Sequence, residues 1–333
     1  MRTSIKFALS VGAVAVFLAG CGGSQPPIGA PGAMPQGHNA TTDRGYNGSG
    51  SYRALLMRPT AKRSPRIFFS AIDQGDQDRI FILTYPQGKY VTSVQGVAGT
   101  GLCTDYRGNV WVAEYGDYAK LSYDGQILLV RHSPYVEADG CAVDRRSGTL
   151  ALTSGDNGNV AVFPNGKGPA TPYATGLTTT YYCTYDGSGN LFVVGLLSQQ
   201  PRLVELRKGA TSFENITLDE TVDGAHAVQW DGSHLSLEAT ISHNRITLYQ
   251  LSIEHGNAKV VGTSALRTQR YPDWNLALGY QFAITGDTIV QSTGSDARHL
   301  DFWRYPAGGH AFRRRHWNGR AIYHIGAVTI DMP

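Results

Sequence analysis

The sequence predicts an all-β fold, a six-bladed β-propeller of four-stranded antiparallel blades that is closed by the C-terminal strand pairing into blade 1. Three observations predict it. A motif of two strands around an Asp/Gly turn returns about every forty residues. Glycine (40 residues) and tyrosine (18 residues) are abundant and only 17% of residues are charged, which is typical of a chain with many turns and strands. The two ends of the repeated region each hold part of one unit.

The repeated motif is clearest in GLCTDYRGNVWVAE, residues 101–114. It combines an apolar strand, a polar turn and a second strand with alternating apolar residues, as a hairpin does. Another strand that ends in a turn follows each copy, and a fourth extended segment follows most of them, so the unit has four strands. Related motifs occupy residues 140–154, 181–195, 226–239 and 279–292.

The spacing of the copies indicates the type of repeat. A β-helix would repeat every roughly twenty residues, and a seventh blade would need a strand pattern that residues 22–51 lack. We interpret the long last step as an insertion around residues 252–274. The early apolar residue of the second strand is Phe68, Val110, Leu150, Leu191, Leu235 and Ile289, in steps of 42, 40, 41, 44 and 54 residues.

The two ends of the repeated region complement each other. Residues 66–94 carry the second, third and fourth strands of a unit without its first strand. Residues 322–331, IYHIGAVTID, look like a first strand that then stops. Pairing of the two segments would close the ring and leave no open sheet edge between the ends. We therefore assign residues 66–333 to the propeller domain.

The motif also carries a family resemblance. The pattern GxxxD-x-x-G-N-φ-x-V, followed by a strand ending in Tyr/Phe-x-x-Gly, resembles the NHL repeat and related bacterial propeller repeats. It is clearest at residues 99–125, 138–166 and 179–209, and the resemblance covers residues 66–331. Propellers of this type serve as protein-binding platforms, as sugar-lactone hydrolases with a central calcium ion, and as lyases. The resemblance therefore implies the fold and leaves the activity open.

The N-terminus predicts export and anchoring. Residues 1–20 have the layout of a signal peptide, because a positive start precedes an apolar run, residues 7–18, that is too short to span a bilayer. The run ends in Leu-Ala-Gly-Cys21, which resembles a bacterial lipobox. That resemblance implies an acylated (for example palmitoylated) Cys21 at the mature N-terminus, anchored to a membrane in the cell envelope. An ordinary signal peptide with a chance cysteine is the alternative.

The composition of residues 21–65 predicts a tether between the membrane anchor and the propeller domain. These residues are rich in Gly, Pro and Ser and nearly free of large apolar residues before residue 52, so they cannot bury enough apolar surface to fold and we expect disorder. Gly22, in place of the Asp that often retains such lipoproteins at an inner membrane, favours the outer membrane and a periplasmic domain. The formal charge of +3 falls to +1 without Arg2 and Lys6, which gives no sign of nucleic-acid binding. We expect a monomer.

Three cysteines, Cys103, Cys141 and Cys183, lie on the first strands of consecutive units. Measured from the turn Asp, Cys103 is one residue out of phase with the other two, and one residue along a strand changes the face. We therefore do not expect three thiolates to converge on a metal. We interpret the cysteines as compact buried apolar residues, with a disulfide between neighbouring blades as the alternative.

A candidate site lies where the loops lead into the innermost strands, which share one rim. Lactonase-type propellers hold calcium at the channel mouth, so the resemblance implies a calcium site, but that pattern expects a Glu near the first blade and Asn-Gly pairs where this chain has Asp-Gly twice. The alternative is that Asp-Gly pairs only form turns. No metal, cofactor or catalytic assignment is firm. The candidates are Asp139, Tyr182, Asp223, Trp274 and His324 for binding, Asp139, Asp223, Asp273 and Asn275 for calcium, and His226 and His324 as a base.

A basic cluster near the C-terminus is the other local feature, with Arg313-Arg314-Arg315-His316-Trp317 close to Arg304, His310 and Arg320. We interpret it as a solvated outer strand. The alternative is an anion-binding patch in which Trp303 and Trp317 stack on a sugar ring.

These observations predict a membrane-anchored extracytoplasmic propeller that binds a protein or an envelope glycan on its rim through surface contact. The competing hypothesis is a calcium-assisted hydrolase or lyase acting through Asp139, Asp223 and His226. Nothing in the chain resembles a phosphate loop, a Ser-His-Asp motif or a zinc spacing.

Overall fold

A computed structural model describes residues 64–73, 78–97, 99–242, 245–267, 281–293, 299–316 and 322–331. The predicted signal peptide, Cys21 and the tether up to residue 63 lie outside these ranges. The part of the chain that the structure describes is built from strands and contains one short 3-10 helix, η1 (Pro164–Gly166). None of its helices is long and apolar enough to cross a membrane.

The strands form three hydrogen-bonded sheets of four, seven and twelve strands. The four-stranded sheet, group 1, has the order β23-β1-β2-β3. The seven-stranded sheet consists of two groups that share β7, because the first half of β7 pairs with β6 and its last residues pair with β8. The bounds in group 1 are β1 (Arg66–Asp73), β2 (Asp78–Thr84), β3 (Tyr90–Gln95) and β23 (Ile322–Asp331).

Groups 2 and 3 are the two halves of the seven-stranded sheet. In both, a short hairpin joins the first two strands, as the repeated motif predicts. The bounds are β4 (Gly101–Thr104), β5 (Val110–Ala113), β6 (Tyr115–Leu121) and β7 (Ile127–Val143) for group 2, and β7, β8 (Leu150–Ser154), β9 (Asn159–Phe163) and β10 (Thr171–Ala174) for group 3.

The twelve-stranded sheet contains groups 4, 5 and 6, which touch through two short parallel pairings, β14 with β18 and β18 with β22. The bounds in group 4 are β11 (Thr179–Tyr185), β12 (Leu191–Leu197), β13 (Gln200–Leu206) and β14 (Glu214–Leu218). Group 5 has β15 (Ala225–Trp230), β16 (Leu235–Ser242), β17 (Arg245–Glu254) and β18 (Asn257–Arg267). Group 6 has β19 (Phe282–Thr285), β20 (Thr288–Thr293), β21 (His299–Arg304) and β22 (Gly308–His316).

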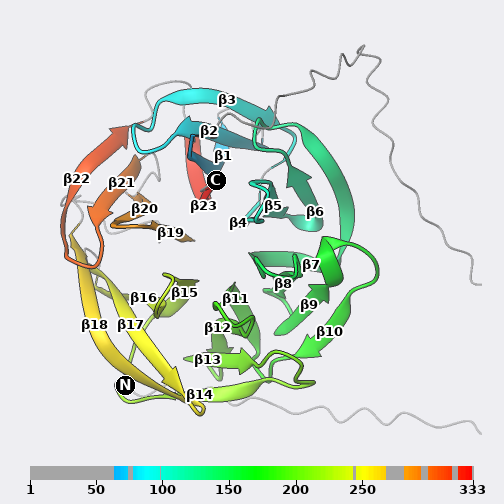
Figure 1. Ribbon diagram of the computed structural model, residues 1–333, viewed down its shortest axis with the longest axis vertical. Coiled ribbons are helices and arrows are strands. Elements are labelled where there is room, and N and C mark those ends of the chain that lie inside the picture. The colour runs from blue at the N-terminus through cyan, green and yellow to red at the C-terminus, as the bar shows by residue number, and fades with distance from the viewer. Residues whose placement is uncertain are drawn as a thin grey trace, which may run out of the picture. The chain divides into compact units, whose positions relative to one another are not determined.

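The groups follow one another around a centre, with the first strand of each innermost and the fourth outermost (Figure 1). We call the first strands, β23, β4, the end of β7, β11, β15 and β19, the inner strands. β23 pairs antiparallel with β1, so that Arg66 lies opposite Asp331 and Phe69 opposite Val328. The segments that the sequence predicts to pair at the two ends of the domain are therefore hydrogen-bonded neighbours.

The core lies between neighbouring groups. Group 6 contributes Phe302 and group 1 contributes Phe69 and Phe81 to one apolar cluster, in which the two group 1 rings stack with centroids 5.1 Å apart. Trp111 and Phe163 lie in the corresponding cluster between groups 2 and 3. Burying each such side chain stabilises the fold by about 1.5–3 kcal/mol, and the repeated pattern of the sequence supplies one such layer per interface.

The interpretation of the cysteines as unpaired apolar residues is wrong for two of them. Cys103 and Cys141 form a disulfide, with an S–S distance of 2.08 Å and a Cα–Cα distance of 5.7 Å. The one-residue offset in phase, which counted against convergence, explains the bond: strands of adjacent groups must use opposite faces to meet. Both side chains lie in the cluster between groups 2 and 3. Cys183 is buried and free, as predicted.

The predicted insertion around residues 252–274 is also wrong in its first part. Residues 257–267 form β18, the fourth strand of group 5, which pairs with β17 over nearly its whole length. The two strands have ten and eleven residues. The extra spacing in this part of the repeat therefore comes from a longer hairpin in place of a loop.

Candidate functional site

A cavity of about 520 Å³ lies at the centre of the ring, lined by the inner strands. We call the C-terminal ends of these strands the C-terminal rim and their N-terminal ends the N-terminal rim. The lining residues come from the C-terminal halves of the inner strands and from the turns that follow them, among them Thr104, Asp144, Gln229 and Thr329. The cavity thus belongs to the C-terminal rim, whereas the sequence-based site was predicted at the N-terminal rim.

Aspartates at the C-terminal rim are held by their own turns. Oδ1 of Asp144 accepts a hydrogen bond from the backbone N–H of Arg146 at 3.0 Å, and Oδ2 accepts one from the Ser147 hydroxyl at 2.5 Å. Asp186 accepts the N–H groups of Ser188 and Asn190, both at 2.8 Å. This Asp is the one in the repeated motif, and at both positions it stabilises the turn that follows the inner strand.

The same role explains two further aspartates. Asp231 accepts the backbone N–H groups of Ser233 and His234, and its other oxygen accepts the Tyr305 hydroxyl. Burial raises the pKa of Asp105, but hydrogen bonds and charge from Lys120 and hydrogen bonds from Asn109 outweigh it, so the pKa of this carboxyl is lowered overall. Both carboxylates are therefore parts of the framework.

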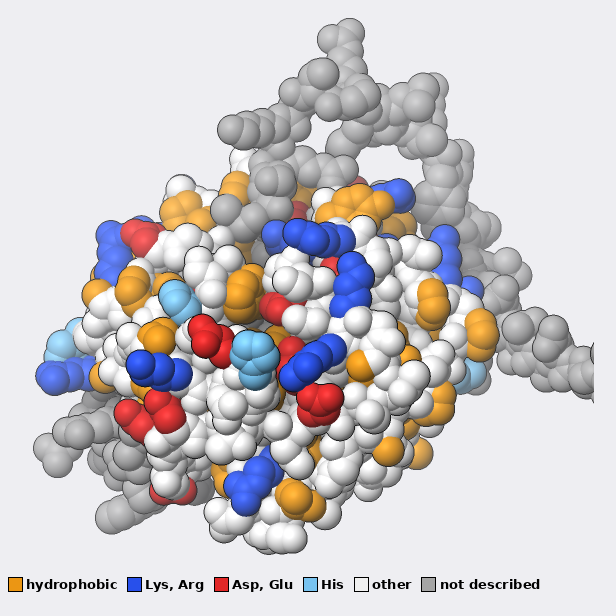
Figure 2. Space-filling model, turned by 60° about the horizontal axis from the view of Figure 1, so that its bottom comes forward, with side chains coloured by type: hydrophobic (Ala, Val, Ile, Leu, Met, Phe, Trp, Pro, Cys, Tyr) orange, Lys and Arg blue, Asp and Glu red, His pale blue; other side chains and the backbone are white. Residues whose placement is uncertain are grey.

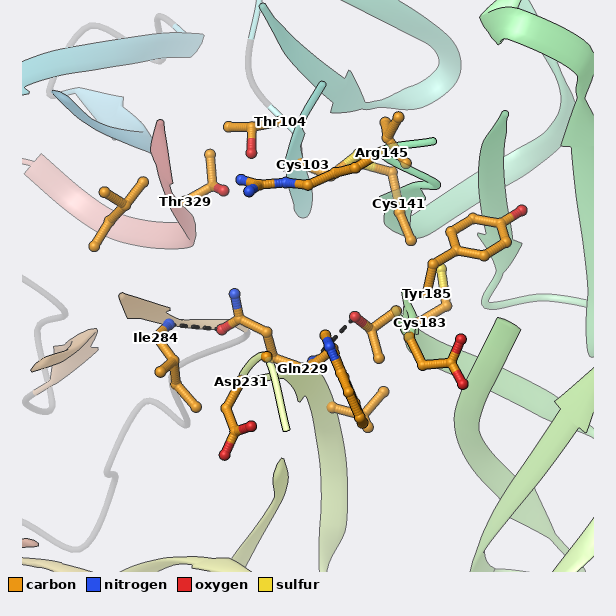
Figure 3. A pocket seen from close by; sticks show the side chains of 18 of the residues that line it. Cys103, Thr104, Cys141, Arg145, Cys183, Tyr185, Gln229, Asp231, Ile284 and Thr329 are labelled. Carbon is orange, nitrogen blue, oxygen red and sulfur yellow. Dashed lines mark hydrogen bonds between the residues drawn. A yellow bond between two sulfur atoms is a disulfide. The ribbon is translucent and has the colours of Figure 1, made fainter. Parts of the chain in front are cut away.

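Four hydrogen-bonding groups that face the cavity are unengaged. They are the guanidinium of Arg145, the amide nitrogen of Gln229 and the hydroxyls of Thr104 and Thr329, and no residue in the described ranges forms a side-chain hydrogen bond or ion pair with them. Figure 3 shows Arg145 extending across the cavity toward Thr329, with the Gln229 amide nitrogen pointing into the space opposite. The cavity therefore presents donors to whatever occupies it.

Burial acts on two titratable groups of the cavity wall, Cys183 and Tyr185. Cys183 is fully buried, and burial raises the pKa of its thiol, so the thiol stays protonated and unreactive. Burial also raises the pKa of Tyr185, with smaller contributions from Cys183 and Asp144. Neither group is available as a base or a nucleophile at neutral pH.

At the N-terminal rim, Asp139 lies in an acidic environment. Burial, together with the negative charges of Glu137 and Asp156, raises the pKa of the Asp139 carboxyl to about 7. Burial and the charge of Asp156 raise the pKa of the neighbouring Tyr135 to about 12. This rim is an acidic cluster that binds a proton near neutral pH.

The predicted calcium ligands do not meet in the described ranges. Asp223 is exposed, and its charge acts on Tyr249, whose pKa is raised by burial and by Glu220 and Asp223. Among the described residues no group of three His, Cys, Asp or Glu side chains could hold a metal ion. Asp273, Trp274 and Asn275 lie outside the described residues, and His324 is placed only as a backbone position of β23, opposite Ile72.

His226, the predicted base, lies between two acceptors. Its Nδ1 is 3.0 Å from the Gly224 carbonyl oxygen, and its Nε2 is 3.3 Å from Oε1 of Glu238. Both ring nitrogens of His226 therefore lie near an oxygen acceptor. Oε1 of Glu238 also accepts the amide of Gln291 at 2.7 Å.

Sequence reasoning missed Glu238 and Gln291. Both are fully buried, and Oε2 of Glu238 and Oε1 of Gln291 accept no hydrogen bond within the described part of the chain. The signal was present in LSLEATIS, where Ser236 and Glu238 alternate on a face that the period places inside the protein.

Tyr182 also differs from the prediction. It is only 5% exposed, and its hydroxyl donates to the Thr100 carbonyl oxygen at 2.9 Å, so it joins the inner strand of group 4 to group 2. The side chain is a framework residue and is not offered to a ligand on the rim.

The basic cluster lies on the outermost strand of group 6, as predicted, but its arginines are engaged. Arg314 forms a bidentate pair with the buried carboxylate of Asp301, with N–O distances of 2.6 and 2.5 Å. Arg313 and Arg315 donate to backbone carbonyls of the β2–β3 turn in group 1. Trp303 is fully buried and cannot stack on a sugar, and Trp317 and Arg320 lie outside the described residues.

The surface seen in Figure 2 carries side chains of both signs, with apolar side chains scattered among them. The exposed apolar residues belong to several strands, including Tyr115 (78% exposed) on β6 and Phe312 (44%) on β22. The exposed apolar side chains therefore do not gather on one strand.

Comparisons with solved structures identify the fold. The chain matches a chain in the crystal structure of a nidogen/laminin complex (12% identity, 80% of this chain and 98% of that one, TM-score 0.62). It also matches TolB from Acinetobacter baumannii (10%, 81% and 67%, 0.57) and the β-propeller domain of Cps50 (Swd1) from Myceliophteria thermophila (13%, 76% and 83%, 0.51). No family model and no curated protein matches the sequence. At these identities the likeness shows the fold alone: the chain is a β-propeller.

Proposed function

We propose that this protein is a lipid-anchored extracytoplasmic binding module, a closed six-bladed propeller whose ligand, a protein or an envelope glycan, engages the central cavity from the C-terminal rim. The six four-stranded groups are the blades. The antiparallel pairing of β23 with β1 supports closure, and the arginines of β22 that reach the β2–β3 turn reinforce the same junction.

The disulfide supports a location outside the cytoplasm. Disulfides form and persist outside the reducing cytoplasm, and the bond between Cys103 and Cys141 joins inner strands of blades 2 and 3. The signal-peptide layout and the lipobox-like Cys21 agree with it.

The anchor has a simple test. Cys21→Ser removes the acylated thiol, so we expect the protein to move from the membrane fraction to the soluble fraction of the envelope, since the acyl chains supply the membrane affinity. Fractionation and immunoblotting measure the shift. Retention of the variant in the membrane fraction would refute the lipid anchor.

A single observation carries the binding role: the cavity presents unengaged donors, while its aspartates are held by their turns. A volume of about 520 Å³ lies within the range of about 300–1,000 Å³ that is usual for ligand sites. The competing metal-assisted hydrolase would need several oxygen ligands at one point, and no such group occurs among the described residues.

In-cell photo-cross-linking tests the binding role. A photoreactive residue in place of Arg146, which is exposed and lines the cavity, should form adducts with an envelope component. The matched control is Val130 on the outer half of β7, 50% exposed, where no adduct is expected. Equal adducts at both positions, or none at Arg146, would contradict a binding site at the cavity.

A further inference from the structure

We propose that the cavity recognises its ligand through an oxyanion, a carboxylate or a phosphate group on an otherwise uncharged polar body, which is held by the guanidinium of Arg145; this inference rests on the proposed function of the cavity. A guanidinium offers a planar fork of donors that matches both groups. In this cavity the fork has no partner in the described part of the protein and lies over the open space (Figure 3).

Arg145 forms no ion pair within the described part of the chain. It directly follows Asp144, whose carboxylate is held toward its own turn by the Arg146 N–H and the Ser147 hydroxyl. The turn therefore fixes the nearest carboxylate beside its own backbone while the neighbouring guanidinium extends over the cavity. A charged donor group that its own protein leaves unpaired at the mouth of a cavity is suited to an external anion.

The opposite wall adds an oriented donor. Oε1 of Gln229 accepts the backbone N–H of Ile284 at 2.7 Å. This bond fixes the orientation of the amide and directs its nitrogen into the cavity, toward the side where Arg145 and Thr329 lie (Figure 3). With the hydroxyl of Thr104, donors from blades 1, 2, 3 and 5 face one space.

The aspartates of the lining limit the ligand's charge. Asp144, Asp186 and Asp231 contribute negative charge to the C-terminal rim, although turn N–H groups stabilise each carboxylate. Asp231 is directed away from the centre in Figure 3, toward the Tyr305 hydroxyl that donates to it. A ligand with one oxyanion near Arg145 and neutral hydroxyls elsewhere fits this distribution, because the hydroxyls can donate to the spare lone pairs of the aspartates.

Titration calorimetry on the full-length protein tests the proposal with four probes that share one hexose ring: glucuronate, glucose 6-phosphate, neutral glucose and cationic glucosamine. We expect at least one of the two anions to bind, and glucose and glucosamine to bind at least about tenfold more weakly. The two anions separate a carboxylate ligand from a phosphate ligand. Failure of both anions to bind, or equal binding of glucose, would overturn the proposal that the ligand carries an oxyanion.

Two variants and one control assign the contacts. Arg145→Gln should weaken anion binding about ten- to hundredfold. Gln229→Glu keeps the acceptor for the Ile284 N–H but replaces the amide donor with a second carboxylate oxygen, so it should weaken binding at least about tenfold. Arg202→Gln removes an exposed charge on β13 and should change nothing. Thermal melts check that each variant is folded.

The outcomes also separate the two proposals. If Arg145→Gln binds the anions as tightly as the parent protein does, the assignment to Arg145 is wrong. If cross-links form at position 146 while no anion binds, the cavity is a binding site for a ligand of other chemistry, and only the present inference fails. If neither occurs, the proposed function fails as well.

Discussion

The two rims of the ring are made by the same inner strands, but they treat their acidic groups in opposite ways. At the C-terminal rim several turns surround an aspartate with N–H and hydroxyl donors, as at Asp144 and Asp186. At the N-terminal rim Asp139 shares its surroundings with Glu137 and Asp156, and the pKa of Asp139 rises to about 7 through burial and through those charges.

This contrast indicates where ligand binding can be added to a repeat. The motif that builds the fold satisfies its own carboxylates at the C-terminal rim, so the residue after the Asp is free to vary, and in blade 3 it is Arg145. At the N-terminal rim the acidic residues lie outside the motif, and only the tertiary structure brings them together.

Removing the disulfide, which joins the C-terminal halves of two inner strands, should lower the free energy of unfolding the most. The double variant Cys103→Ala/Cys141→Ala removes a link between residues 38 positions apart. For a loop of this length the chain-entropy relation gives about 3–4 kcal/mol of lost stability. Denaturant unfolding under non-reducing conditions measures it, with Cys183→Ala as the control for loss of a buried sulfur. An equal loss in both variants would show that the bond itself contributes little.

The turn aspartates come next. Asp186→Ala removes the acceptor of the Ser188 and Asn190 backbone N–H groups and of the Asn190 amide, so we expect a loss of about 2–3 kcal/mol in the free energy of unfolding. Asp223→Ala, at the N-terminal rim and exposed, should stay within about 0.5 kcal/mol of the parent. Equal losses at the two positions would remove the contrast between the rims.

The smallest expected effect is the change in stability with pH that results from protonation of Asp139. Its pKa is about 7 in the folded protein, against 3.8 for the free group, so the folded state binds more protons between these values and stability should rise as the pH falls from about 8 to about 4. Asp139→Asn should flatten this dependence and be more stable at pH 8 by about 1–2 kcal/mol. Thermal melts across this pH range measure it, and a parent profile with the opposite slope would contradict the burial of this carboxyl.

Much of the architecture can be predicted from the sequence, because the same turn and strand residues recur in each copy of the repeat. The Asp/Gly turns and alternating strands place β5, β8, β12 and β16, and the two partial units at the ends predict the pairing of β1 with β23. The long hairpin of group 5 was not predicted, because its two strands are longer than the corresponding strands of the motif copies.

The site was harder to predict for a geometric reason. Whether Cys103 meets Cys141 depends on which faces adjacent sheets present to each other, and that relation is not contained in either strand alone. The same holds for Glu238 and Gln291, which meet across two blades. Arg145 looks like any turn residue in the sequence, and only its extension over the cavity distinguishes it (Figure 3).

The most direct test compares the two rims in one experiment. Photoreactive residues placed at Arg146 on the C-terminal rim and at Asp223 on the N-terminal rim, both exposed, report which end of the ring meets its ligand in the cell. We expect an envelope adduct from position 146 and none from position 223. An adduct from position 223 with none from position 146 would contradict it.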